Sequence, residues 1–228
     1  MEYARTQNID AVRFTDRDTC RENIMTFFPT TTIFDVPWNK LYKRSVVTEN
    51  RIRFTDIRRC QDATFNIDFF NCINSAASVD KAYYNYMENT VDDVRRKFPV
   101  DYIDIVTFYY PHLIGILTDW GVYRDRIKLH YDSTFVLSVY STADRYDNPR
   151  WGLTKEQQHE YIADCMSREE VTSFLPTAQV REDVLPVLRI VRDRDVKELM
   201  RLHNKERRRE AIRNNKLLIG VYRKLKGQ

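Results

Sequence analysis

Hydrophobic and polar residues alternate along several short stretches in the middle of the chain. These stretches are rich in Val, Ile, Thr, Tyr and Phe, and the breaks between them fall at Pro99, Pro111, Gly115, Gly121 and the pair Asp132–Ser133. Branched and aromatic side chains pack well on a pleated sheet, and breaks about every ten residues are typical of consecutive strands. The pattern predicts four strands, at residues 102–109, 113–118, 126–131 and 134–140.

The alternation also indicates which faces of these strands are buried. Ile127, Leu129 and Tyr131 alternate with Lys128 and His130, which predicts a strand with one buried face. The stretch 102–109 is almost continuously apolar, so both of its faces are expected to be covered. Further strands are predicted at residues 45–47, 51–55, 64–73 and 184–191, with an extended segment at 30–34.

Helices are predicted where the hydrophobic spacing lengthens and capping residues precede it. One helix is expected from Cys20 to Phe28, with Asp16 or Thr19 as its cap and Pro29 as its end. A second is expected at 81–96, and a third at 155–166 after Thr154. Together these patterns predict a mainly β, α+β core with flanking helices.

The last segment of the chain differs from the rest in charge. From Arg192 onward there are 13 Lys or Arg against 5 Asp or Glu, while the remainder holds 24 against 28. A basic helix is predicted to about Leu218, so the chain divides into a core domain with an N-terminal arm at 1–191 and a basic extension at 192–228. Nucleic-acid contact and docking on an acidic face of a neighbouring copy both remain open for this helix. Its candidate contact residues are Arg201, Lys205, Arg207, Arg208, Arg209 and Arg213.

Composition excludes several classes of protein. The chain has 228 residues and only 5 Gly, and neither of the common Gly-rich phosphate-binding motifs occurs. No apolar run approaches the roughly 18 residues of a membrane span, and the N-terminus does not resemble a secretory signal. We therefore expect synthesis in the cytosol and no membrane partner. The 14 Tyr fit either a β-rich core or a protein–protein interface.

Four cysteines are spread through the chain without metal-binding spacing. They are Cys20, Cys60, Cys72 and Cys165. None belongs to a C-x-x-C pair, and no His stands at a zinc-ligand spacing from them, so neither a metal nor a cofactor is predicted. Reduced thiols are expected inside a cell, and disulfides between subunits are the alternative.

Two further groups of residues suggest function on sequence grounds alone. Lys40, Lys43 and Arg44 form a compact basic cluster, which predicts either a nuclear-import signal or a solvated loop. His159 lies near Cys165, yet nucleophile pairs need a third group to orient the base, and the spacing offers none. We therefore expect no catalytic site.

Several short segments in the second half of the chain form a recognisable series. They are Tyr86–Asn89, Tyr102–Val106, Pro149–Trp151, Glu160–Tyr161, Glu170–Phe174 and Glu182–Leu188. In this order they resemble polyhedrin and granulin, the occlusion-body matrix proteins of baculoviruses and related insect viruses. The basic cluster at Lys40–Arg44 falls about where that family carries its nuclear-import cluster. The family is acidic towards its C-terminus, whereas this chain is basic there, which suggests a distant, nudivirus-like relative.

The resemblance implies an antiparallel β-sandwich of jelly-roll type with added helices. It also implies trimers that assemble into a crystalline lattice embedding virions in the host nucleus. Above about pH 10, Tyr and Lys lose protons, so such a lattice is expected to dissolve in alkali. The alternative function is that of a basic RNA-binding structural subunit, such as a nucleocapsid or ribosome-associated protein.

Overall fold

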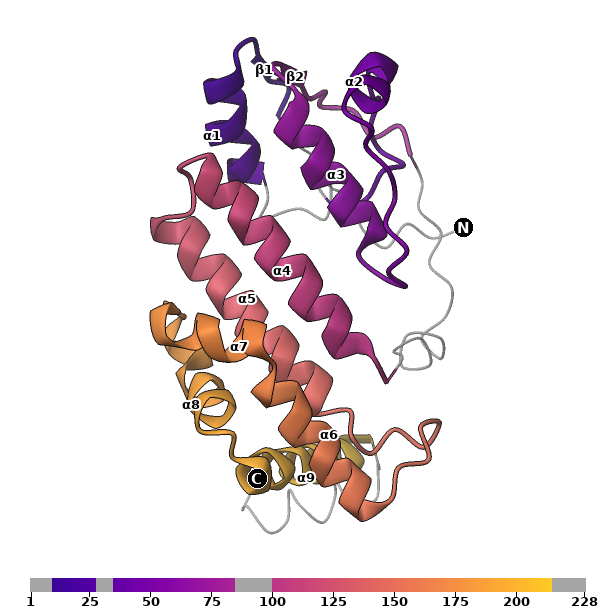
Figure 1. Cartoon of the computed structure of the whole chain (residues 1–228), viewed down its shortest axis with the longest axis vertical. Coiled ribbons are helices and arrows are strands. Elements are labelled where there is room, and N and C mark those ends of the chain that lie inside the picture. The colour runs from indigo at the N-terminus through magenta and orange to yellow at the C-terminus, as the bar shows by residue number, and fades with distance from the viewer. Residues whose placement is uncertain (1–9, 28–34, 85–99, 215–228) are drawn as a thin grey trace. The chain divides into compact units, whose positions relative to one another are not determined.

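The computed structural model describes residues 10–27, 35–84 and 100–214, and these are mostly helical (Figure 1). The α-helices are α1 (Arg17–Phe27), α2 (Arg44–Glu49), α3 (Gln61–Cys72), α4 (Tyr102–Asp119), α5 (Asp125–Ala143), α6 (Lys155–Ser167), α7 (Glu169–Phe174), α8 (Leu185–Asp193) and α9 (Val196–Asn214). Strands β1 (Arg13–Phe14) and β2 (Ala76–Ala77) pair antiparallel, with Arg13 opposite Ala77.

The prediction of a mainly β, jelly-roll sandwich is therefore wrong. The stretches 102–109 and 113–118 join into the single helix α4, and 126–131 and 134–140 join into α5. The other predicted strands also change type: 45–47 lies in α2, 64–73 overlaps α3, 184–191 overlaps α8, and 51–55 has no regular structure.

Helix α4 shows why the strand prediction failed. Its buried residues include Ile103, Val106, Tyr109, Leu113 and Ile116, and their spacing of three or four follows one side of a helix. Branched residues favour strands only weakly, and long-range packing overrides that preference. Neither break taken from the sequence interrupts this helix, because Pro111 and Gly115 both lie inside it and are exposed.

Helix α5 buries the pair that was expected to form a turn. Asp132 and Ser133 are fully buried. Asp132 accepts hydrogen bonds from the Lys128 ammonium at 2.7 Å, from the Gln179 backbone N–H at 2.6 Å and from the Tyr123 hydroxyl. Leu129, expected on the buried face, is exposed.

The helices predicted near the two ends of the chain and at 155–166 are confirmed within the described residues, and the predicted ends at Phe28 and 215–218 lie outside them. Asp16 accepts a hydrogen bond from the Thr19 N–H at 2.8 Å at the start of α1. Thr154 caps α6 through a reciprocal pair of hydrogen bonds with Gln157. In the predicted helix 81–96, residues 81–84 are not helical, and residues 85–96 lie outside the described residues.

The chain separates into two compact units. One comprises Met1–Phe135 with Ala178–Arg181, and the other Val136–Thr177 with Glu182–Gln228, so α5 contributes to both. In the first unit, α3 packs on α4 around Phe65, Ile67, Phe69, Leu113 and Leu117. In the second, residues of several helices are buried, including Val139, Tyr161, Ile162, Met166, Val191 and Leu199. The predicted boundary at residue 192 remains a prediction.

Candidate functional site

Helix α9, in the second unit, is held in place by one of its sides. Leu199 is fully buried and His203 nearly so. The His203 ring has Nδ1 2.6 Å from Asp144 Oδ1 and Nε2 3.1 Å from Asp147 Oδ2. Arg207 also donates to Asp147. These contacts leave the opposite side of α9 facing solvent.

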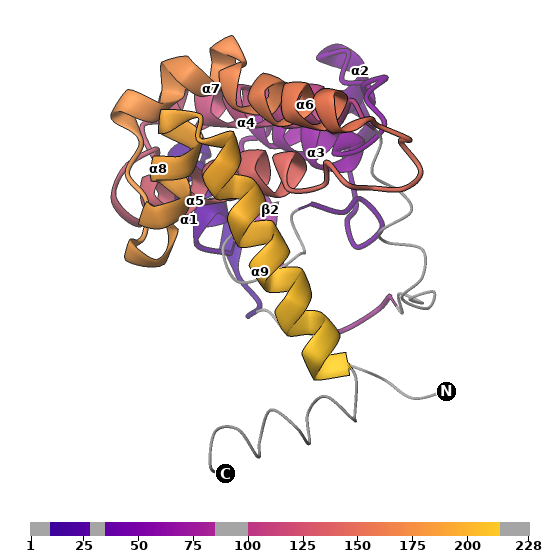
Figure 2. The same cartoon turned by 90° about the horizontal axis from the view of Figure 1, so that it is seen from below.

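The solvent-facing side of α9 is strongly basic. Lys197, Arg201, Lys205, Arg208 and Arg209 recur at helical spacing and are all exposed, and we call this set the basic face of α9. Figure 2 shows α9 reaching away from α6, α7 and α8. A shallow hollow runs along the face, lined by Arg201, Asn204, Lys205, Arg208 and Arg209.

Most of this face has no internal counter-charge. Arg201 is the exception, because its guanidinium donates twice to Glu198, each time at 2.6 Å. That contact raises the pKa of Arg201 and lowers the pKa of Glu198. Lys205, Arg208 and Arg209 form no ion pair with any residue that the structure describes. Their charges are available to a partner.

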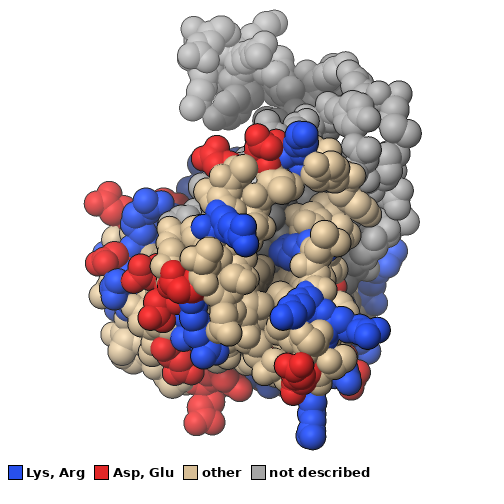
Figure 3. Space-filling model, turned by 90° about the horizontal axis from the view of Figure 1, so that it is seen from above, with Lys and Arg blue, Asp and Glu red and all other residues tan. Residues whose placement is uncertain are grey.

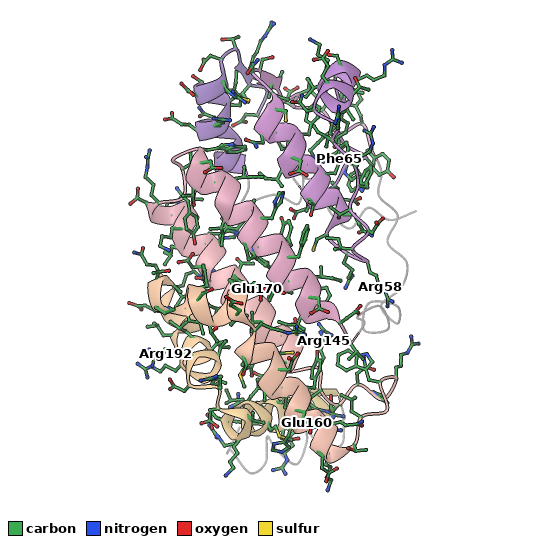
Figure 4. The ribbon with its side chains drawn as sticks, viewed as in Figure 1. Arg58, Phe65, Arg145, Glu160, Glu170 and Arg192 are labelled. Carbon is green, nitrogen blue, oxygen red and sulfur yellow. The ribbon has the colours of Figure 1, made fainter. Side chains whose placement is uncertain are left out.

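The second unit also carries an acidic face on α6. Glu156, Glu160 and Asp164 are exposed and stand four residues apart on one side of the helix. Figure 4 labels Glu160 on this helix. Asp164 pairs with Arg168 at 2.9 Å, whereas Glu156 and Glu160 form no ion pair within the described residues. The three acids have the same spacing as Arg201, Lys205 and Arg209 on α9.

The predicted contact helix is therefore sorted by the structure into two sides. Arg201, Lys205, Arg208 and Arg209 lie on the basic face, while Arg207 points to Asp147 on the anchored side. The side chain of Arg213 lies outside the described residues. The acidic face of α6 was missed, although the i, i+4, i+8 spacing of its acids was visible in a correctly predicted helix.

The structure divides the predicted import cluster. Lys43 and Arg44 are exposed at the start of α2. Lys40 instead donates to the Val36 carbonyl and to Asn39 Oδ1, and burial lowers the pKa of its ammonium to about 8. Only two of the three charges are thus presented to solvent.

The four cysteines differ in accessibility, and all four are free thiols. Cys20 and Cys165 are buried, whereas Cys60 and Cys72 are half-buried. Burial raises the pKa of the Cys60 thiol to about 11 and also raises those of Cys20 and Cys72. Because the thiolate is the reactive form, these three thiols are poorly reactive at neutral pH. Disulfides between subunits remain a prediction.

Residues suited to chemistry are scattered in the described chain. His159 and Glu160 are exposed on α6, whereas Cys165 is buried on the same helix. His112 Nε2 lies 2.7 Å from Asp68 Oδ1, and this hydrogen bond raises the pKa of the His112 ring. Within residues 10–27, 35–84 and 100–214, no three His, Cys, Asp or Glu side chains are grouped so that they could hold a metal ion. In the same ranges no helix is long and apolar enough to cross a membrane.

Comparison with known proteins adds no relative to this picture: no family model, no curated protein and no solved structure matches the chain. The two charged faces of the second unit are thus the features on which a functional hypothesis rests.

Proposed function

We propose that this protein is a structural protein that assembles with copies of itself, rather than an enzyme. The observation that supports the proposal is the match between the basic face of α9 and the acidic face of α6. Each face presents three like charges at i, i+4 and i+8, which span about 12 Å along a helix. The basic face of one copy is therefore complementary to the acidic face of another.

Such a contact is heterologous, because it joins two different surfaces. Each copy would donate α9 to one neighbour and receive the α9 of another at α6, which produces a ring or an open chain of subunits. Exposed ion pairs contribute about 0.2–1 kcal/mol each, so three of them contribute about 0.6–3 kcal/mol. Association through these faces is therefore expected to be weak, multivalent and sensitive to salt.

The occlusion-body role is the most specific form of this proposal. In that form the assembly is a crystalline body that embeds virions in the host nucleus. The jelly-roll trimer implied by the resemblance to polyhedrin is not part of it, because the fold is helical. Expression in insect cells, followed by electron microscopy of the nuclei for ordered bodies, tests this form directly.

A charge-reversal experiment tests self-assembly itself. One variant carries Arg201→Glu, Lys205→Glu and Arg209→Glu, and the other carries Glu156→Lys, Glu160→Lys and Asp164→Lys. Each variant alone has two faces of like charge and is expected to sediment as a monomer at low salt. An equimolar mixture of the two is expected to recover the association of the unmodified protein.

A matched control reverses charges elsewhere in the second unit. Arg189 and Arg192 are exposed on α8, and the double variant Arg189→Glu, Arg192→Glu is expected to associate normally. Monomeric behaviour of the unmodified protein at low salt, or a mixture that stays monomeric, would contradict the proposal. Loss of RNA binding in the α9 variant, with unchanged sedimentation, would instead favour the RNA-binding alternative for this helix.

A further inference from the structure

A second basic surface lies on the first unit, where the segment around α2 covers α3. Tyr42 packs edge-on against Phe65 and Phe69 of α3, and Phe54 stacks on Phe65 with ring centroids 4.4 Å apart. The chain on both sides of α2 is thus held on the same ring, which Figure 4 labels. This packing fixes the segment on both sides of α2 against α3.

The segment is rich in unpaired positive charge. Between Val36 and Arg59 there are seven Lys or Arg against two Asp or Glu. Five of the bases are exposed and form no ion pair with any described residue. We call these five the basic row: Lys43, Arg44, Arg51, Arg53 and Arg58.

The basic row is extended rather than clustered. Lys43 and Arg44 begin α2, Arg51 and Arg53 follow its end, and Figure 4 places Arg58 near the start of α3. Helix α3 has 12 residues, so a chain running beside it covers about 18 Å. Figure 3 looks onto the end that holds α1 and α2, and Lys and Arg side chains are spread over both halves of that face. Most of the acidic side chains in view lie on the left.

Exposed aromatic rings accompany the row. Trp38 stacks on Tyr84 with centroids 4.3 Å apart, and both residues are exposed. Phe54, between Arg53 and Arg58 in the chain, remains 53% exposed despite its contact with Phe65. Two large rings are thus partly exposed in a segment where bases outnumber acids by seven to two.

We propose that this surface binds single-stranded nucleic acid, with the basic row on the phosphates and Trp38 and Phe54 stacking on bases. A positively charged path with interspersed aromatic rings is the combination that single strands require. Duplex grooves are usually entered by a longer helix, whereas α2 has only six residues. The proposal goes beyond self-assembly, because it uses the other unit and a different partner.

Fluorescence anisotropy with a labelled single-stranded RNA of mixed sequence tests the proposal. The variant Lys43→Gln, Arg44→Gln, Arg51→Gln, Arg53→Gln is expected to bind at least tenfold more weakly than the unmodified protein. Single-strand contacts contribute a slope of about −0.7 each to the dependence of log affinity on log salt, so the slope is expected to become shallower by about 2–3. Circular dichroism checks that the variant keeps its helix content.

The matched control removes four charges from α9 through Arg201→Gln, Lys205→Gln, Arg208→Gln and Arg209→Gln. Its affinity for the RNA is expected to stay within about twofold of the unmodified protein at equal salt. Because this control also removes the basic face used for self-assembly, RNA binding and association can fail independently. An equal or larger loss of RNA binding in the α9 variant would overturn the proposal.

A second pair of variants isolates stacking from charge. Trp38→Leu is expected to weaken RNA binding about fivefold or more without changing the salt slope, because stacking involves no counterion release. Phe108→Leu replaces an exposed ring on α4 and is expected to leave RNA binding unchanged.

Vesicles with anionic headgroups provide the last comparison, because they offer phosphates without bases. Binding of the unmodified protein to these vesicles but not to RNA would overturn the proposal.

Discussion

At the scale of single residues, Asp132 shows how a charged side chain can be part of a core. Its carboxylate is fully buried, and it accepts from an ammonium, a hydroxyl and a backbone N–H. The neighbouring Ser133 hydroxyl accepts from the Arg181 N–H at 3.0 Å. The two side chains therefore attach the segment Ala178–Arg181 to α5 within the first unit.

Replacing Asp132 by Ala is expected to destabilise the protein strongly. The change leaves Lys128 and the Gln179 N–H without their acceptor, and breaking a buried ion pair costs about 3–5 kcal/mol. Because Lys128 keeps some contact with solvent, we expect a loss of about 3 kcal/mol in the free energy of unfolding, measured by urea denaturation. Asp119→Ala, at an exposed acid on α4, is the control and should change stability by less than about 0.5 kcal/mol.

At the scale of secondary-structure elements, α4 and the turn after it contain glycines in opposite conformations. Gly115 is helical and exposed, and a Cβ built on it would meet nothing within 4 Å. Gly121 has equally free surroundings but a φ of +71°. A Cβ atom would have room at both positions, so the two glycines differ only in the conformation of their backbone.

This difference predicts opposite effects for the same substitution. Gly115→Ala is expected to stabilise the protein by about 0.5–1 kcal/mol, because Ala has the higher helix propensity. Gly121→Ala is expected to destabilise it by about 1 kcal/mol, because a left-handed conformation is unfavourable for any residue with a Cβ. Thermal unfolding of both variants measures the two shifts. A destabilising Gly115→Ala would show that α4 is not continuous through that position.

At the scale of the whole molecule, burial of tyrosines determines how the protein responds to alkali. Burial raises the pKa of many tyrosines above the ordinary value of about 10. Among them are Tyr42, Tyr109, Tyr123, Tyr131, Tyr140 and Tyr161. The folded protein therefore keeps phenol protons that the unfolded chain releases near pH 10. Stability is fully present below about pH 10 and falls as pH rises above it.

The loss of folding stability above about pH 10 changes the mechanism that we expect for dissolution of the assemblies in alkali. The contact with Glu198 raises the pKa of the Arg201 guanidinium above its already high ordinary value, so the basic face of α9 keeps positive charge in alkali. We expect assemblies to dissolve only as the subunits unfold. Parallel titration by light scattering, tyrosinate absorbance and far-ultraviolet circular dichroism measures this, and the three signals should change together. If the assemblies dissolved while the helix content stayed intact, this prediction would be wrong, and direct charge repulsion between subunits would be the cause of dissolution.

Local signals were reliable where they concerned the ends of helices. Asp16 and Thr154 cap α1 and α6 as their positions in the chain predicted. The basic tail was also visible in the sequence, and the helix predicted there is confirmed as far as Asn214, where the described residues end. The stretches around Pro111 and Gly115 were misassigned, because residues that usually interrupt regular structure were taken as its ends.

The candidate surfaces were only partly visible in the sequence. Lys43 and Arg44 could be selected from their neighbours, but the inward turn of Lys40 depends on the Val36 carbonyl, which the sequence does not show. Likewise, the division of α9 into an anchored and an open side follows from Asp144 and Asp147, which lie more than 50 residues away in the chain.

The sequence by itself determined the caps, the charge of the tail and the periodic spacing of its bases, because these depend on residues a few positions apart. Tertiary structure decided that the branched, aromatic stretches are helices, since burial on one side outweighs a strand preference worth less than about 1 kcal/mol per residue. Tertiary structure also decided which charged side chains are bound to other residues and which face solvent. The contacts of His203 with Asp144 and Asp147 join distant parts of the chain, and only folding brings these groups within hydrogen-bonding distance.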